Sequence, residues 1–266
     1  MTPEGSVSFD RAADYYDATR ILPPETHAAM LGLVADELRD RGRCLEIGVG
    51  TGRIALPIVE AGLDLVGIDI SSSMLRKLVE KAGTMPVELA VADATRLPFA
   101  ADSFGGAFGV HVLHLIAGWR EAARELVRVV RPGGTLLFDL GHADPTRLGV
   151  WQGPAHEIEQ RFLLEAGIAR RHPGITSTAD LDDVLSESGA VPRDLPRVTG
   201  SMMLAPSVLL RLFEDGVFAW TWDIEPELRS RAAASVRAWA TERYGDPDQP
   251  QRFDVVIAFR AYDLPA

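Results

Sequence analysis

The sequence predicts an α/β fold, in which a mostly parallel sheet carries helices on both faces. Short apolar runs of strand length alternate with helical stretches over roughly the first 140 residues, and a glycine-rich turn follows the first of these runs. Strands separated by helices connect through right-handed crossovers, which makes the strands parallel. With 266 residues, of which 47% are hydrophobic, the chain has room for one large domain with a modest appendage.

The first half of the chain supplies five strands and the helices between them. The strands are expected at residues 43–47, 63–70, 87–91, 105–110 and 135–140. The helices are expected at residues 25–40, 53–61, 71–82 and 119–130. The first of these helices has apolar residues at helical spacing. Ser71 has the hydroxyl that a helix N-terminus favours as its cap, and Pro132 stops the last helix before the fifth strand.

The regular alternation of strands and helices ends at about residue 143. Helices are expected at residues 157–166, 179–188, 206–214 and 227–244, and strands at residues 193–199 and 252–262. The two late strands complete a seven-stranded sheet with an antiparallel edge strand and a small helical cap. The expected organisation is a lid and helix at 1–41, a core at 42–202 and 251–266, and a cap inserted at 203–250. Aromatic residues in the divergent half suit either an apolar substrate pocket or an ordinary core: Trp151, Phe213, Phe218, Trp220 and Trp222.

Charge and composition exclude several classes of function. The formal net charge is −11, whereas a protein that neutralises phosphates needs a basic face, so neither nucleic acid nor an anionic membrane is an expected partner. No apolar run has the length of a membrane span, and the first residues lack a secretory signal, so we expect a cytoplasmic protein, as a monomer or homodimer. The single cysteine, Cys44, leaves no disulfide or thiolate cluster, and no metal site is expected.

A glycine-rich turn is the most informative motif. Residues 45–53 have the sequence Leu-Glu-Ile-Gly-Val-Gly-Thr-Gly-Arg. Glycine lets the backbone turn tightly and approach a ligand closely, and the following helix presents free amides there. A dinucleotide fingerprint has glycine at the position of Arg53, whereas the third glycine here is Gly52. The turn therefore favours a ligand without a pyrophosphate and disfavours an NAD-dependent oxidoreductase.

Two aspartates follow the next two strands. Asp69 ends the second strand, 21 residues after Gly48, and an acid at that place accepts hydrogen bonds from a ribose. Asp93 follows the third strand, where a carboxylate can accept a hydrogen bond from an exocyclic amine such as that of adenine. Either aspartate alone could equally cap a helix or a loop. Three successive strand ends with this chemistry together predict a nucleoside site, with Met74 as an apolar wall.

The chain resembles the class I S-adenosylmethionine-dependent methyltransferases, in the small-molecule group related to the ubiquinone and menaquinone enzymes. The resemblance covers about residues 5–145 and is carried by residues 9–17, 45–53, 64–69, 91–99, 102–116 and 128–140. It implies a Rossmann-like sheet, S-adenosylmethionine as cofactor and S-adenosylhomocysteine as product. The implied activity is methyl transfer to a small molecule, with the accepting oxygen, carbon or nitrogen left open. A non-catalytic module that binds either cofactor form is the alternative.

The resemblance also implies roles for matching residues. It assigns the methionine portion to Glu46 and the glycine turn, the ribose to Asp69, and the adenine to Asp93 with Ala94. Tyr16 and Arg20, in the segment that folds over the cofactor, would contact the methionine carboxylate or the substrate. The full expected set of cofactor-binding residues is Tyr16, Arg20, Glu46, Gly48, Gly50, Asp69, Ile70, Met74, Asp93, Ala94 and Val110.

Two histidines near the end of the fourth strand are the candidate catalytic residues. Methyl transfer is an in-line displacement, for which alignment and exclusion of water suffice when the acceptor is already reactive. A hydroxyl or an acidic carbon needs a general base, and histidine has a suitable pKa. His111 is the first candidate because it stands at the strand end, and His114 is the second. Either could equally be a structural histidine.

Overall fold

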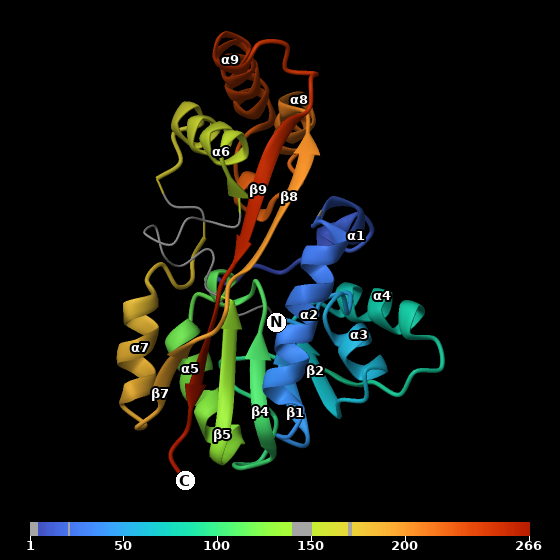
Figure 1. Cartoon of the computed structure of the whole chain (residues 1–266), viewed down its shortest axis with the longest axis vertical. Helices are drawn as coiled ribbons and strands as arrows, with labels where there is room; N and C mark the ends of the chain where they lie inside the picture. The colour runs from blue at the N-terminus through green and yellow to red at the C-terminus, as the bar shows by residue number, and fades with distance from the viewer. Residues whose placement is uncertain (1–4, 21, 140–150, 170–171) are drawn as a thin grey trace. The chain divides into compact units, whose positions relative to one another are not determined.

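The chain folds into two units, each with its own sheet and core. The computed structural model describes residues 5–20, 22–139, 151–169 and 172–266 (Figure 1). Unit 1 comprises Met1–Thr146, Pro173–Val198 and Ile257–Ala266, and unit 2 comprises Arg147–His172 and Thr199–Val256. These limits differ from the expected division, because the segment before residue 172 groups with the later helices and the N-terminal region groups with the core.

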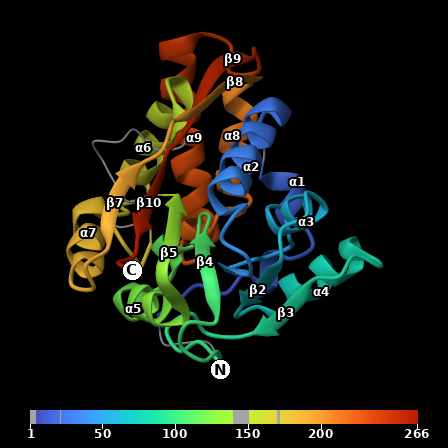
Figure 2. The same cartoon turned by 60° about the horizontal axis from the view of Figure 1, so that its bottom comes forward.

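Unit 1 is built on a seven-stranded sheet with the order β3-β2-β1-β4-β5-β10-β7 (Figure 2). Strands β1 to β5 pair in parallel, and β10 runs antiparallel to both of its neighbours. The strands are β1 Cys44–Ile47, β2 Leu65–Asp69, β3 Glu88–Val91, β4 Phe104–Gly109, β5 Val130–Asp139, β7 Val191–Asp194 and β10 Phe259–Asp263. The strand order reverses beside β1, which pairs with both β2 and β4. Open α/β sheets bind ligands at such a switch point, outside the carboxyl ends of the strands.

Helices cover both faces of this sheet, as predicted. The elements are η1 Asp10–Ala12, α1 Tyr16–Thr19, α2 Pro24–Leu38, α3 Ala55–Glu60, α4 Ser72–Ala82, η2 Leu113–Leu115, α5 Trp119–Val129 and α7 Thr178–Ser186. Buried side chains of α5 and α7 join the sheet in one apolar core. Helix α2 crosses the other face (Figure 1). Its Leu38 packs closely against Gly106 of β4. The predicted cap of α4 is confirmed, since the Ser71 hydroxyl accepts a hydrogen bond of 3.1 Å from the Met74 amide.

Unit 2 contains a three-stranded sheet and a group of helices. Its strands follow the order β6-β9-β8, with β6 Trp151–Gln152, β8 Val198–Leu204 and β9 Gln251–Ile257. Its helices are α6 Pro154–Glu165, α8 Pro206–Glu214, η3 Ala219–Thr221 and α9 Pro226–Tyr244. Aromatic rings fill its core: Phe213 lies 5.2 Å from Phe162 and 5.1 Å from Trp220 between ring centroids. This packing explains why α6 belongs with the later helices.

Each of the two late strands is divided between the sheets. The expected strand at 193–199 becomes β7 and β8, and the expected strand at 252–262 becomes β9 and β10. The apolar alternation runs without interruption through Phe253, Val255, Ile257 and Phe259, so periodicity alone shows no break. The antiparallel strand β10 lies between β5 and β7, so β7 forms that edge of the sheet. No helix among the described residues is long and apolar enough to cross a membrane.

Candidate functional site

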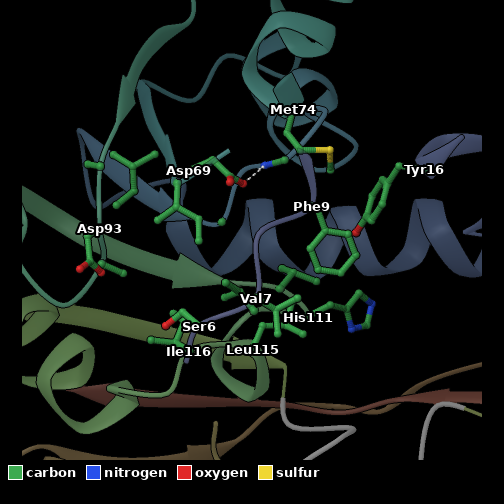
Figure 3. Close-up of a pocket in the computed structure, with 18 residues that line it drawn as sticks. Ser6, Val7, Phe9, Tyr16, Asp69, Met74, Asp93, His111, Leu115 and Ile116 are labelled. Atoms are coloured by element: carbon green, nitrogen blue, oxygen red, sulfur yellow. Dashed lines mark hydrogen bonds between the residues drawn. The ribbon is translucent and has the colours of Figure 1, made fainter. Parts of the chain in front are cut away.

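Two adjoining cavities open at the carboxyl ends of the parallel strands of unit 1. The larger has a volume of about 680 Å³, and strand ends and the N-terminal segment both line it (Figure 3). The smaller has a volume of about 350 Å³. The two cavities share the lining residues Tyr16, Gly48, Gly50, Val110 and His111. They therefore form neighbouring compartments of one site at the switch point beside β1.

The structure brings most of the expected site residues to these cavities. The larger cavity is lined by Tyr16, Gly48, Gly50, Asp69, Ile70, Met74, Asp93, Ala94, Val110 and His111. Glu46 lines the smaller cavity only. Arg20 and His114 line neither of them. The Arg20 guanidinium lies 4.7 Å from the ring centroid of Tyr16, and His114 is buried, with its backbone carbonyl accepting a hydrogen bond from Gly174.

The turn after β1 requires glycine for its backbone angles and for space. Gly48, Gly50 and Gly52 have φ angles of +66°, +56° and +78°, in the left-handed region that other residues rarely adopt. A Cβ atom on Gly48 would also lie only 2.4 Å from Cγ2 of Val112. The Gly50 amide donates a hydrogen bond of 2.9 Å to Oδ2 of Asp69. This bond holds the turn against the end of β2.

Asp69 combines a structural role with an open acceptor face. Its Oδ1 accepts a hydrogen bond of 2.8 Å from the Ser71 amide, in addition to the bond between Oδ2 and Gly50. Burial raises the pKa of Asp69, and these backbone bonds oppose that rise. A carboxylate offers about four lone pairs, so two amide donors leave it able to accept further bonds from a ligand hydroxyl.

Asp93 closes a turn at the end of β3. Its Oδ1 accepts the Thr95 amide at 2.9 Å, and its Oδ2 accepts the Thr95 hydroxyl at 2.7 Å. Such a turn is the ordinary role of an aspartate after a strand. Asp93 nevertheless lines the larger cavity together with Ala94, so the same residue stabilises the turn and faces the cavity.

Glu46 is a buried carboxyl group without a hydrogen bond at one oxygen. The residue is 2% exposed, and its Oε2 has no hydrogen-bond partner within the described part of the chain. Burial raises the pKa of Glu46 well above its usual range, and the neighbouring charge of Asp69 adds to the rise. A polar group left unpaired in an apolar surrounding is costly. The orphaned oxygen belongs to a side chain that lines the smaller cavity.

His111 is paired with an acid that sequence reasoning missed. Its Nδ1 lies against Oδ2 of Asp139, whose side chain is fully buried at the end of β5. His111 has a φ angle of +55°, a strained conformation of the kind that clusters at functional sites. The register of β4 and β5 pairs Gly109 with Phe138, so Val110 and Asp139 follow at neighbouring strand ends and His111 comes one residue later. Asp139 is a third acid at a strand end, after Asp69 and Asp93. This position in the sequence could have identified it as a site residue.

The N-terminal segment is fastened to α4 by acidic side chains. Ser71 donates a 2.6 Å hydrogen bond to Asp10, and this bond is the main reason why the pKa of Asp10 falls to about 2. Ion pairs of 2.9 Å and 2.7 Å join Lys77 to Asp14 and Lys81 to Asp17. Both lysines of the chain are used here. The same segment supplies Ser6, Val7, Phe9 and Tyr16 to the larger cavity (Figure 3).

Comparison with known proteins identifies relatives over most of unit 1. A family model described as a methyltransferase domain matches residues 45–138. Demethylmenaquinone methyltransferase from Renibacterium salmoninarum is 34% identical over 167 residues, which are 61% of this chain and 67% of that protein. The protein of the same name from Paenarthrobacter aurescens is 31% identical over 138 residues, so the match spans 51% of this chain and 54% of that relative.

Solved structures share the fold at low sequence identity. The YcgJ protein from Bacillus subtilis has a TM-score of 0.63 and 20% identity, covering 90% of this chain and all of that one. Phosphoethanolamine N-methyltransferase 2 from Haemonchus contortus, solved with phosphomonomethylethanolamine and S-adenosylhomocysteine, has a TM-score of 0.55 and 18% identity, covering 98% of this chain and 61% of that one. Similarity at this level shows the fold alone.

Proposed function

The chain belongs to the class I S-adenosylmethionine-dependent methyltransferases, and we propose that its two adjoining cavities hold the cofactor for methyl transfer to a small molecule. The observation that carries the proposal is the shared wall of the cavities. There the left-handed glycine turn at Gly48 and Gly50 meets Asp69 on one side and the buried Glu46 on the other. The two cavities suit the two chemically different halves of an adenosyl amino acid.

The larger cavity suits the adenosine half of the cofactor. The remaining lone pairs of Asp69 would accept hydrogen bonds from the ribose hydroxyls. Ile70 and Met74 provide apolar surface for the base, and Asp93 and Ala94 line the same cavity from the end of β3. Arg20 and His114 do not line either cavity, so the proposal assigns no direct contact to them.

His111 is the group that we assign to proton transfer. S-adenosylmethionine, when bound, supplies a methyl group on a positively charged sulfur, and the protein aligns the acceptor with it and excludes water. Because Nδ1 of His111 faces Asp139, proton transfer from an acceptor falls to Nε2. The bound cofactor would donate its methyl group and keep the electron pair of the broken methyl–sulfur bond, while Nε2 of His111 would take the proton that a hydroxyl or an acidic carbon loses.

The acceptor class is a small organic molecule with such an acidic proton. Relatives named demethylmenaquinone methyltransferase make reduced demethylmenaquinone the first acceptor to test. The enzyme is proposed to be cytoplasmic, as a monomer or homodimer. The net charge of −11 supports the further proposal that neither nucleic acid nor an anionic membrane surface is its partner.

Transfer of a labelled methyl group tests this function. The protein is incubated with S-adenosylmethionine labelled in its methyl group, and with either reduced demethylmenaquinone or a cellular metabolite extract. We expect label in an organic-soluble product with the wild-type protein and much less with Asp69→Ala. Tight cofactor binding without label in any small molecule would instead favour the non-catalytic binding module.

A further inference from the structure

The loop after β4 holds His111 in a backbone conformation that residues with a side chain rarely adopt. Its φ angle is +55°, and Asp102 is the only other non-glycine residue in the described ranges with a positive φ. A conformation of this kind costs energy and persists only where the surrounding structure enforces it. The contacts of the residues that follow His111 therefore decide where its imidazole lies.

The side chain of Val112 fills the space that two glycines leave open. A Cβ atom on Gly48 would overlap with Cγ2 of Val112, and a Cβ atom on Gly109 would lie 2.6 Å from its Cγ1. Gly48 follows β1 and Gly109 ends the neighbouring strand β4, so Val112 packs across the ends of two paired strands. Valine is branched at Cβ and its χ1 angle is restricted, so both methyl groups keep fixed places. This contact fixes the chain one residue after His111.

The next turn of the loop is fixed from another direction. The carbonyl groups of Leu113 and His114 accept hydrogen bonds from the amides of Ile175, at 3.3 Å, and Gly174, at 2.8 Å. Gly174 approaches so closely that a Cβ atom there would overlap with the carbonyl oxygen of Leu113. Leu113 and Ile175 also belong to the buried core of unit 1. These contacts oppose any movement of the loop that would relieve the strain at His111.

We infer that Val112 is a positioning residue for methyl transfer, whose side chain holds the imidazole of His111 between Asp139 and the cavities. This inference rests on the proposed function, because it takes His111 as the group that accepts the proton. Nδ1 of His111 faces Asp139, while His111 lines both cavities. Only a narrow range of backbone angles at His111 satisfies both conditions, and small displacements of a reacting group reduce the rate strongly.

The same contact connects His111 to the glycine turn. Gly48 lines both cavities, and Val112 and Leu115 line the larger one. Figure 3 shows His111 and Leu115 on the same side of that cavity. Because Val112 packs on Gly48, the turn proposed to bind the cofactor and the loop that carries the histidine share one packing contact. A valine that served only the core would affect stability and leave the orientation of the imidazole unchanged.

Removal of both methyl groups in Val112→Ala is the first test. The kcat for methyl transfer is expected to fall about tenfold, because the imidazole is no longer held in line with the acceptor. The Kd of S-adenosylhomocysteine should change by less than about threefold. Nitrogen NMR should show the tautomer of His111 with its proton on Nδ1 in the wild type and a mixture of tautomers in the variant.

Val127→Ala is the matched control for this variant. Val127 is also a partly buried valine packed against the core of unit 1, but it lies on α5 and lines neither cavity. The control should lower the Tm to a similar extent as Val112→Ala, while kcat and the tautomer of His111 stay as in the wild type. The comparison separates a loss of packing from a loss of alignment.

Restoring the lost volume from the opposite side tests the contact itself. Gly109→Ala alone places a methyl group against Val112 and within 3.0 Å of Ile47, so it is expected to displace the valine and to lower kcat. In the double variant Gly109→Ala with Val112→Ala, the new methyl group takes the place of the missing Cγ1. The double variant should therefore have a higher kcat than Gly109→Ala alone.

Three results would overturn the inference. Val112→Ala could keep the kcat and the His111 tautomer of the wild type, as expected of Val127→Ala. Turnover and affinity for S-adenosylhomocysteine could fall by the same factor, or the losses of the two single variants could multiply in the double variant. Absence of methyl transfer by the wild type to any acceptor would refute the proposed function instead, and the NMR comparison would then decide alone whether Val112 fixes the imidazole.

Discussion

The Nδ1 atom of His111 pairs with the buried carboxylate of Asp139, and this contact ties the end of β4 to the end of β5. An acid in this position orients the imidazole and favours the tautomer with its proton on Nδ1. His111 lines both cavities, whereas the Asp139 side chain is fully buried. We therefore regard Asp139 as a positioning residue and His111 as the group that meets the acceptor.

Asp139→Asn is expected to lower kcat for methyl transfer by about 10²-fold, at the low end of the contribution of general acid–base catalysis. The amide can present a donor to Nδ1 and so favours the wrong tautomer. Affinity for S-adenosylhomocysteine should change by less than about twofold, because the pair acts on the acceptor. Methyl-transfer kinetics and calorimetry measure the two effects, and nitrogen NMR of His111 reports the tautomer directly.

The matched variant for this pair is His111→Ala, alone and combined with Asp139→Asn. Residues that act as a unit are non-additive, so the double variant should be about as slow as His111→Ala alone. If the fold-losses in kcat of the two single variants multiply in the double variant, or if cofactor affinity and turnover fall equally, the pair only supports the fold of the site.

The N-terminal segment is expected to control release of the product. Replacing both lysines, as Lys77→Ala with Lys81→Ala, removes the ion pairs to Asp14 and Asp17. Exposed ion pairs contribute little individually, so we expect S-adenosylhomocysteine to dissociate only about twofold to tenfold faster. Stopped-flow measurement of dissociation checks this, and the wild type should approach the variant at high ionic strength because salt screens such pairs.

Arg76→Ala is the control for release, since Arg76 lies on the same helix and donates its hydrogen bond to Ser73 of that helix instead of pairing with a described acid of the N-terminal segment. Its dissociation rate should match that of the wild type. If the lysine variant releases the product no faster than this control, the ion pairs do not restrain the segment.

Glu46→Gln is expected to stabilise the unliganded protein at neutral pH, by on the order of 1 kcal/mol. The folded-state pKa of Glu46 lies well above its usual value of 4.5, because the site is buried. The folded protein therefore binds the proton more strongly than the unfolded chain, and stability is lost as pH rises from about 4.5 through the folded pKa. Thermal unfolding across this range should show the Tm advantage of the variant growing with pH.

Asp10 provides the opposite sign as a control. Its folded-state pKa of about 2 lies below the usual 3.8, so its contribution is present above 3.8 and is lost as pH falls toward 2. Asp10→Asn should consequently lower Tm at neutral pH and lose its effect in acid. A Glu46→Gln variant that melts below the wild type at every pH would contradict the cost assigned to the buried carboxyl.

Local chemistry made much of the site predictable. The glycine turn, the cap at Ser71 and the aspartate at the end of β2 depend on residues close in sequence, and their positions follow from the strand and helix pattern. Parallel strands place their carboxyl ends at one edge, so Asp69 and Asp93 could be brought together without knowing any distance.

What escaped prediction depends on register and on long-range packing. Asp139 reaches His111 only through the pairing of β4 with β5, and this register cannot be derived from the sequence alone. The break between β9 and β10 was hidden because the apolar alternation continues across it. Arg53 was interpreted only as an obstacle to pyrophosphate binding, since its place in the smaller cavity depends on the path of the whole turn.

Calorimetric titration of S-adenosylhomocysteine into the wild type and Asp69→Ala tests the central claim most directly. The account predicts binding by the wild type and a loss of about 1–3 kcal/mol in the variant, because polar partners are left unpaired. Asp64→Ala, which changes an exposed acid just before the opposite end of β2, should bind as the wild type does. Equal affinity of Asp69→Ala and the wild type, or binding of NADH in place of S-adenosylhomocysteine, would contradict the account.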